Sequence, residues 1–189
     1  NADDFMILKI LTENADVAYT NQTCNYICDG TITISNPTGG WNGYEFSIDG
    51  GVNWSANMNY TSLCAGIYEV MMRDAYYTNC TVHLGTVHIE APGWLWAEVW
   101  VTDETCNGVC DGTITFANPV GGWDGYEFSI DGGITWSSNM VYTGLCPYYY
   151  PIMMRDALYP YCVNSGYAFI NGPAPLSANV TSHDITCYG

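Results

Sequence analysis

The feature that most constrains this chain is an internal repeat with a period of 82 residues. Residues 24–80 and 106–162 align without a gap, and 38 of the 57 aligned positions are identical. Such self-similarity is the mark of a protein built from copies of one structural unit. The chain of 189 residues therefore predicts two complete copies of one small domain.

Both ends of the chain also fit the repeat. Residues 185–189 match the opening of a third copy, since Cys187 lies 81 residues after Cys106. Phe5 and Ile7 fall at the positions of Val87 and Ile89, in the last strand-like segment of the first copy. We expect residues 1–12 to be the final strand of a preceding copy, 13–93 the first repeat, 94–175 the second, and 176–189 the start of the next.

Two explanations of residues 1–12 are open. The chain is a segment of a longer array, or these apolar residues form a donor strand that completes the sheet of a neighbouring molecule, as in a pilus-like subunit. The intact mass of the native protein separates the two, because only the second explanation allows a mass near 20.8 kDa.

Each copy is predicted to be all β. Residues 31–34 and 44–48 alternate between apolar and polar side chains, as half-buried strands do. Asp49-Gly50-Gly51 is a strong hairpin-turn signal, and residues 66–72 and 81–90 are further strand-like segments. About seven short strands in each copy favour an immunoglobulin-like β-sandwich.

Composition limits the partners. Three Lys and Arg residues stand against 19 Asp and Glu, for a net charge of −16. Binding to nucleic acid or to anionic lipid needs basic residues, so neither is expected. No run of 18 apolar residues is present to insert into a membrane. The expected partners are neighbouring repeats, copies of the chain itself, and surface polysaccharide.

The cysteines indicate disulfides and an extracellular location. Each copy contains four cysteines, an even number that in a small β domain favours disulfides and an oxidising compartment. Zinc is not favoured, because no CxxC pair or suitably spaced histidine accompanies Cys24 and Cys28. Four cysteines allow three pairings in each copy, and the spacing alone does not choose among them.

Each copy contains the same short motifs in the same order. They are Cys24 with Asp29-Gly30, Gly39-Gly40 with residues 44–51, residues 63–68, and Arg73-Asp74-Ala75 with Cys80. They recur in the second copy, although Pro147-Tyr148-Tyr149 replaces Ala65-Gly66-Ile67 there. This order of motifs resembles the SprB repeat of large surface adhesins in gliding Bacteroidetes. The resemblance implies a structural or adhesive segment of a long cell-surface filament, used in adhesion or gliding motility.

The resemblance also implies a disulfide pattern. That family usually opens and closes with one cysteine each, and the two additional cysteines appear together in both copies. The implied pairs are Cys24–Cys80, Cys28–Cys64, Cys106–Cys162 and Cys110–Cys146, with Cys187 pairing in the next repeat. The rival pairing, Cys24 with Cys28 and Cys64 with Cys80, stays open.

One motif in each copy suggests a braced turn. Ser47 to Trp54, and again Ser129 to Trp136, fit the Asp-box pattern S-x-D-x-G-x-x-W. In such a hairpin the Asp accepts backbone N–H bonds and the Trp packs beneath the turn. We expect a structural role, and we expect Arg73 and Arg155 to form an ion pair with the following Asp or to clamp carbonyls.

No cofactor and no catalytic group is expected. No nucleophile, acid–base pair or metal cluster recurs in both copies, and His83, His88 and His183 occur in single copies only. Calcium prefers carboxylate oxygens, so the acidic turns are weak candidates for it, the alternative being simple turn-forming Asp beside Gly. These candidates are Asp29, Asp49, Asp74, Asp111, Asp131 and Asp156.

Aromatic residues and sequons complete the candidate sites. A sugar-binding or surface-binding patch would use Trp41, Trp123, Tyr148 and Tyr149, unless these residues pack in the core or between repeats. Candidate glycosylation sites are Asn21, Asn53, Asn59, Asn79 and Asn179. The leading hypothesis is a structural filament segment, and the alternative is an array of carbohydrate-binding modules attached to a secreted enzyme.

Overall fold

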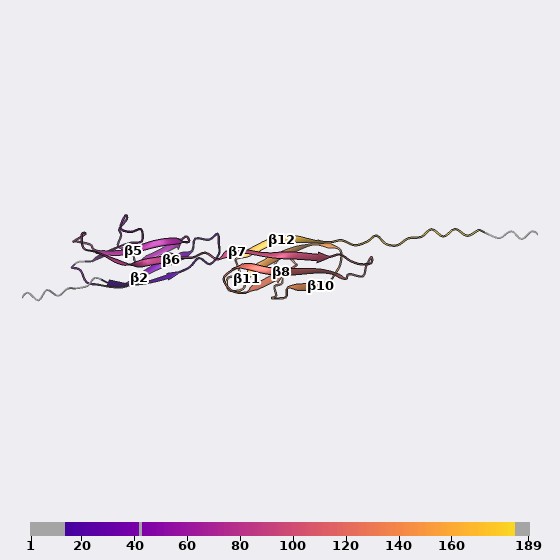
Figure 1. The fold of residues 1–189 in the computed structure, drawn as a ribbon, viewed down its shortest axis with the longest axis horizontal. Helices are drawn as coiled ribbons and strands as arrows, with labels where there is room; N and C mark the ends of the chain where they lie inside the picture. The colour runs from indigo at the N-terminus through magenta and orange to yellow at the C-terminus, as the bar shows by residue number, and fades with distance from the viewer. Residues whose placement is uncertain (1–13, 42, 184–189) are drawn as a thin grey trace, which may run out of the picture. The chain divides into compact units, whose positions relative to one another are not determined.

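The computed structural model describes residues 14–41 and 43–183, and this part of the chain is all β, as expected (Figure 1). The chain divides between Trp94 and Leu95 into two compact units. The expectations for residues 1–12 and for Cys187 lie outside the described residues. The described part contains no helix that is long and apolar enough to cross a membrane.

The first unit is a sandwich of two three-stranded antiparallel sheets. One sheet has the strand order β1-β2-β4 and the other β3-β5-β6. This is the immunoglobulin-like division, in which strands A, B and E face strands C, F and G. The strands are β1 (Asn14–Thr20), β2 (Gly30–Thr38), β3 (Tyr44–Ser47), β4 (Asn59–Leu63), β5 (Gly66–Asp74) and β6 (Thr81–Ile89).

The second unit repeats this arrangement strand by strand. Its sheets have the orders β7-β8-β10 and β9-β11-β12. The strands are β7 (Gly93–Thr102), β8 (Gly112–Gly122), β9 (Tyr126–Ser129), β10 (Val141–Leu145), β11 (Tyr148–Asp156) and β12 (Val163–Ile170). Each described unit therefore has six strands, slightly fewer than the sequence suggested.

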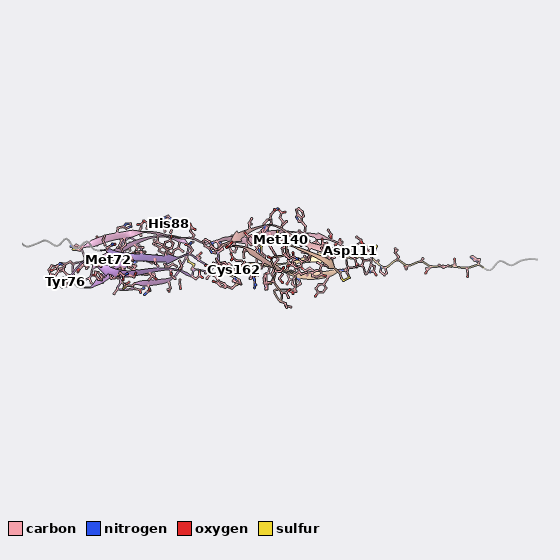
Figure 2. All side chains as sticks on the ribbon, turned by 90° about the horizontal axis from the view of Figure 1, so that it is seen from below. Met72, Tyr76, His88, Asp111, Met140 and Cys162 are labelled. Carbon is pink, nitrogen blue, oxygen red and sulfur yellow. A yellow bond between two sulfur atoms is a disulfide. The ribbon has the colours of Figure 1, made fainter. Side chains whose placement is uncertain are left out.

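Alternation along the strands produces the core of each unit. Ile32 and Ile34 of β2 are buried, while the alternating Thr31 and Thr33 are less so, and Met72 of β5 is buried on the facing sheet (Figure 2). Burial of such side chains is the main source of stability in a domain of this size. The second unit has the equivalent core of Ile114, Phe116, Phe128, Ile152, Met154, Ala168 and Ile170.

The two units differ at their last strand. β6 has nine residues and a register shift opposite Val70 and Met71, whereas β12 has eight residues and pairs with β11 without a shift. Gly66 pairs with Ile89, and its counterpart Tyr148 pairs with Ile170. The period therefore falls from 82 to 81 residues at this strand, and the outward-facing residues there differ between the units.

Candidate functional site

The Asp-box hairpin after β3 is braced by its own side chains. The Asp49 carboxylate accepts the backbone N–H of Asn53 at 2.9 Å and its side-chain amide at 2.6 Å. The Ser47 hydroxyl oxygen accepts the N–H of Gly51 at 2.9 Å, and the Trp54 indole N–H donates to the Gly51 carbonyl at 2.7 Å. The expected structural turn is present.

These hydrogen bonds favour the ionised form of the aspartate. The backbone N–H of Asn53 is the main cause that lowers the pKa of Asp49 to about 2. In the second unit Thr135 replaces Asn53, and its hydroxyl, followed by its N–H, lowers the pKa of Asp131 to about 2. Both carboxylates are charged at neutral pH, and both accept hydrogen bonds from residues of their own hairpin turns.

The single arginine of each unit joins this hairpin to β5. The Arg73 guanidinium lies 4.4 Å from the centre of the Trp54 ring and pairs with Glu45 of β3, with Nη2 2.6 Å from Oε2. Arg73 was expected to pair with its chain neighbour Asp74 or to clamp carbonyls, and the pairing with Asp74 was wrong, because adjacent strand residues point to opposite faces of a sheet. The arrangement recurs with Arg155, Trp136 and Glu127.

Asp74 is buried and has a separate role. Its carboxylate accepts the backbone N–H groups of Trp41, Tyr76 and Tyr77, so it ties the loop before β3 to the turn after β5. Buried carboxylates are stabilised by such bonds. Asp156 does the same in the second unit with the N–H groups of Trp123, Leu158 and Tyr159.

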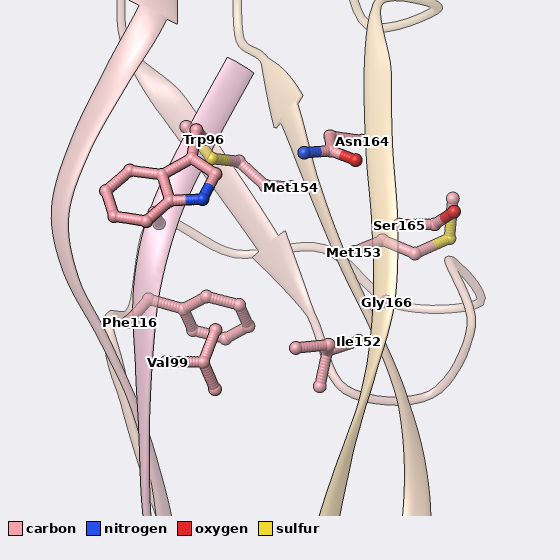
Figure 3. Close-up of a pocket in the computed structure, with 10 residues that line it drawn as sticks. Trp96, Val99, Phe116, Ile152, Met153, Met154, Asn164, Ser165 and Gly166 are labelled. Carbon is pink, nitrogen blue, oxygen red and sulfur yellow. The ribbon is translucent and has the colours of Figure 1, made fainter.

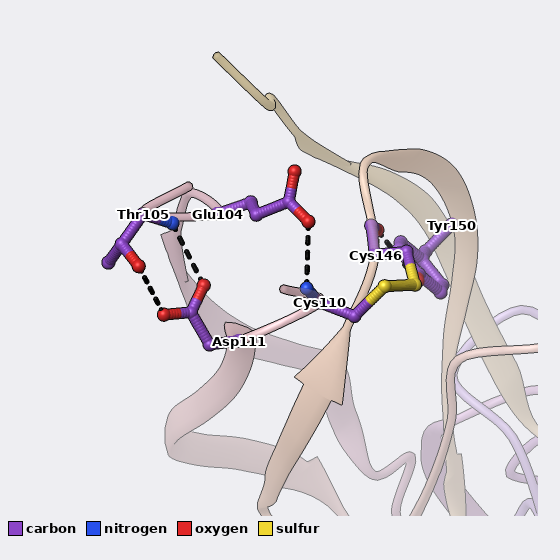
Figure 4. Close-up of a disulfide and its surroundings, with 6 residues drawn as sticks. All are labelled: Glu104, Thr105, Cys110, Asp111, Cys146 and Tyr150. Atoms are coloured by element: carbon purple, nitrogen blue, oxygen red, sulfur yellow. Dashed lines mark hydrogen bonds between the residues drawn. A yellow bond between two sulfur atoms is a disulfide. The ribbon is translucent and has the colours of Figure 1, made fainter. Parts of the chain in front are cut away.

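The six calcium candidates are not brought together. Asp29 accepts the N–H and hydroxyl of Thr23, and Asp111 accepts those of Thr105, as Figure 4 shows for the second unit. Asp49 and Asp131 bind their own turns, and Asp74 and Asp156 each tie two loops together, as described above. Within residues 14–41 and 43–183, no three His, Cys, Asp or Glu side chains gather in a way that would hold a metal ion.

One predicted disulfide is confirmed in each unit. Cys28–Cys64 and Cys110–Cys146 join the segment before the second strand to the turn between the fourth and fifth strands. The Tyr150 hydroxyl donates to the Cys146 carbonyl at 2.9 Å and further fixes this turn (Figure 4). Burial raises the pKa of Tyr150, so the hydroxyl stays protonated as a donor. The disulfides fit an oxidising, non-cytoplasmic compartment.

The pairing expected for the opening and closing cysteines was wrong. Cys80 and Cys106 are free thiols, whereas Cys24 and Cys162 are disulfide-bonded, so neither Cys24–Cys80 nor Cys106–Cys162 is formed. The rival pairing fails as well, because Cys28 bonds to Cys64.

The physical reason is distance within the unit. Cys24 follows Gln22, whose N–H donates to the carbonyl of Glu90 beyond the end of β6. Cys80 instead accepts the N–H of Asp74, at the far end of β5. A nine-residue strand separates these ends by about 26 Å, far more than a disulfide spans.

An exposed aromatic face lies on β11 and β12 of the second unit. The Tyr149 ring stacks on Tyr167 at 4.7 Å and lies 6.1 Å from Phe169, and all three side chains are exposed. Tyr149 is thus the candidate patch residue that the structure places on a flat aromatic surface. Tyr167 and Phe169 were not among the predicted patch residues, although their spacing of two places them on one face of a strand.

The other patch candidates lie elsewhere. Trp41 is 86% exposed and contacts Tyr77 edge to face, and Tyr77 contacts Tyr76. Tyr148 contacts Tyr150, and Trp123 is only partly exposed in its loop. The four candidates therefore do not form one site.

The corresponding face of the first unit carries polar side chains and Ile67 in place of the aromatic rings. Glu69 of β5 forms a contact of 2.6 Å with His83 and accepts the hydroxyl of Thr86, and these contacts lower the pKa of Glu69. His88 is also exposed on β6 (Figure 2). The aromatic face is therefore specific to the second unit.

A small hollow opens into the core of the second unit between β7 and β12 (Figure 3). Its volume is about 170 Å³, and Trp96, Phe116, Ile152, Met154 and Asn164 are among the residues around it. Sites for small molecules are usually about 300–1,000 Å³. The hollow is too small and too apolar to suggest an active site.

The sequons differ in accessibility. Asn59, Asn79 and Asn179 are exposed. The amides of Asn53 and Asn21 are hydrogen-bonded within the fold, to the Asp49 carboxylate and the N–H of Glu90. Asn59, Asn79 and Asn179 are therefore the better candidates for glycosylation.

Comparison with solved structures gives a weak likeness. No family model and no curated protein matches the chain. Among solved structures, the chain is similar to the three N-terminal domains of the Highly Immunogenic Outer Capsid protein of bacteriophage RB49, at 16% identity and a TM-score of 0.40. The match covers 84% of this chain and 58% of that structure, so the chain spans little more than half of its length.

Proposed function

We propose that this chain is a structural segment of a long extracellular adhesin or filament of the SprB type, without catalytic activity of its own. The observation that carries the proposal is the repetition of complete internal bracing. Both sandwiches contain a disulfide, an Asp-box hairpin and an arginine stacked on tryptophan at equivalent positions. What is repeated is the scaffold, whereas the exposed faces differ.

This bracing suits a chain under tension. The Cys28–Cys64 bond closes a segment of 36 residues that includes β2, β3 and β4, so this segment cannot extend when a unit unfolds. Disulfides also disfavour the unfolded chain that proteases attack. A surface filament exposed to shear and to proteases benefits from both effects.

The location can be tested on intact source cells. Antibodies raised against this two-unit chain should label unpermeabilised cells, and protease treatment of intact cells should remove the signal. Labelling that requires permeabilisation would overturn the proposal. An antibody against a cytosolic protein of the same cells serves as the control for membrane integrity.

A second candidate function is binding of polysaccharide by the aromatic face of the second unit. Sugars stack their C–H faces on exposed aromatic rings, and the rings of Tyr149 and Tyr167 form such a platform. A glycan array probed with the chain should give signals that Tyr149→Ala with Tyr167→Ala abolishes. Ile67→Ala, at the position of Tyr149 in the first unit, is the matched control and should leave the signals intact. If Ile67→Ala abolished the signals and the double tyrosine variant kept them, the aromatic face of the second unit would be excluded as the binding site.

A further inference from the structure

Two tyrosines of the second unit stand side by side on neighbouring strands. The rings of Tyr149 on β11 and Tyr167 on β12 have centroids 4.7 Å apart, and their planes are inclined by only 23°. Tyr149 pairs with Phe169 and Tyr167 pairs with Pro151, so the two tyrosines are diagonal neighbours on one face of an antiparallel pair. The register of the strands therefore fixes their contact.

Both rings are open to the solvent and point the same way. Tyr149 is 54% exposed and Tyr167 is 66% exposed. Side chains on a sheet stand roughly perpendicular to it, so both hydroxyl ends point away from the core. The Cε atoms, which are the ring carbons next to the hydroxyl, therefore lie along neighbouring edges of two nearly parallel rings. This is the arrangement in which two oxidised tyrosines are joined carbon to carbon.

We propose that Tyr149 and Tyr167 are a modification site, at which a haem peroxidase and hydrogen peroxide join the two rings into dityrosine. The product is a covalent bond between β11 and β12 on the outward face of their sheet. The inference goes beyond the proposed function, because it depends on this pair of rings alone and needs neither adhesion nor a tandem array.

The reaction balances in atoms and electrons. Each tyrosine loses one electron and its phenolic proton to give a tyrosyl radical, and the two electrons and two protons reduce one hydrogen peroxide to two waters. The two radicals then form one bond between a Cε of each ring. Each of these carbons releases its hydrogen as a proton, and each oxygen takes up a proton to become a phenol again. The protein loses two hydrogen atoms in total.

Other close tyrosines of the chain are arranged differently. The rings of Tyr76 and Tyr77 are 4.9 Å apart but nearly perpendicular, at 82°. The rings of Tyr148 and Tyr150 are 5.2 Å apart at 81°, and the Tyr150 hydroxyl donates to the Cys146 carbonyl. An edge-to-face pair directs the edge of one ring at the face of the other, so its Cε atoms are not aligned. These pairs are internal controls for the effect of ring orientation.

The first unit provides a second internal control. Ile67 pairs with His88 as Tyr149 pairs with Phe169, and Thr86 stands at the position of Tyr167. Neither Ile67 nor Thr86 can form a phenoxyl radical. The link should therefore form in the second unit at a position where the first unit cannot form it.

The link would extend the brace that the disulfide already provides. The Cys110–Cys146 bond holds the turn before β11, and Tyr149 follows Cys146 by three residues. A bond from Tyr149 to Tyr167 would join β11 to β12, the last strand of the unit. Pulling on the chain beyond β12 could then not peel this strand from the sheet.

The test is oxidation of the full chain with a haem peroxidase and hydrogen peroxide at low protein concentration. Free thiols are alkylated first, because they reduce tyrosyl radicals. The expected product is a monomer that is lighter by two hydrogen atoms and shows dityrosine fluorescence. Since the two rings are already aligned, this product should exceed covalent dimers by about tenfold.

Peptide mapping locates the bond. After reduction of the disulfides, a protease that cleaves before aspartate separates residues 131–155 from residues 156–183. The oxidised chain should give these two peptides as one cross-linked species, and fragmentation should place the link at Tyr149 and Tyr167. The same species should be found in the protein isolated from its source cells.

Matched variants keep every ring and remove one hydroxyl. Tyr149→Phe and Tyr167→Phe should each abolish the link within the chain, and Tyr148→Phe should leave its yield unchanged. Circular dichroism checks that the variants are folded.

Three results would overturn the inference. They are an unchanged yield of intramolecular dityrosine in Tyr149→Phe, a product that joins Tyr76 to Tyr77 instead, and absence of the cross-linked peptide from the native protein. Cell-surface labelling of the source cells is a separate measurement, so any of these results would leave the proposed function standing.

Discussion

The guanidinium carbon of Arg73 lies 4.4 Å from the centre of the Trp54 ring, and Arg155 lies 4.2 Å from that of Trp136. Each contact joins an Asp-box hairpin to the central strand of the sheet in which that hairpin begins, β5 in the first unit and β11 in the second. These are two of the three basic Lys and Arg residues in a chain of net charge −16. The arginines therefore serve the scaffold rather than an anionic ligand.

Removing this arginine should destabilise its unit moderately. Arg73→Ala loses both the stacking on Trp54 and the pair with Glu45, and we expect a loss of about 1–2 kcal/mol in the free energy of unfolding. Arg73→Lys keeps the charge but loses the planar stacking, so its effect should be intermediate. Urea unfolding measures both variants, and an unchanged midpoint for Arg73→Ala would contradict the assigned role.

The Asp-box aspartates should make the free energy of unfolding depend on pH in the acid range. The pKa of Asp49 and of Asp131 is about 2 in the folded state, against 3.8 ordinarily, so the folded state holds fewer protons between these values. Their contribution is complete above about pH 4 and is lost as pH falls toward 2. The variant Asp49→Asn with Asp131→Asn should show a shallower fall in urea midpoint over this range. Asp124→Asn, at an exposed position, is the control, and its urea midpoint should fall with pH as steeply as that of the unaltered chain.

The intra-unit disulfide should be a large part of each unit's stability. Cys28 and Cys64 are 36 residues apart, and closing a loop of this length restricts the unfolded chain by about 4 kcal/mol. Cys28→Ala with Cys64→Ala should shift the unfolding transition of the first unit and leave that of the second unit in place. Calorimetry resolves the two, and a shift of both transitions would show that the units do not unfold independently.

Gly30, in the Asp-Gly step of the opening motif, should not tolerate a side chain. A Cβ there would lie 2.8 Å from Ile89 Cγ2 and 2.9 Å from the Leu63 carbonyl oxygen. We expect Gly30→Ala to cost about 1–3 kcal/mol through this overpacking. Gly66→Ala is the control, since the nearest atom to its Cβ lies at 3.8 Å. Equal urea midpoints for the two variants would contradict this account.

Local pattern was enough to predict much of the fold. The alternation in residues 31–34, 44–48 and 66–72 marks strands that the structure contains, because one face of each is buried. The Asp-box spacing predicted a turn in which Asp49 accepts backbone N–H bonds, since the chemistry is confined to a few adjacent residues. The Cys28–Cys64 bond followed from family resemblance rather than from spacing.

Relationships across the fold were harder to predict. The partner of Arg73 lies on another strand, 28 residues away, and is set by strand register. The failure of the Cys24–Cys80 pair reflects the length of β5, which places the ends of the repeat at opposite ends of the sandwich. The aromatic face became visible only when pairing placed Tyr149 opposite Phe169.

Imaging of the native protein by electron microscopy tests the central claim most directly. A tandem array of these sandwiches should appear as a long filament with a regular axial repeat on the scale of one domain. Isolated particles of the size of two domains, with no axial repeat, would contradict it.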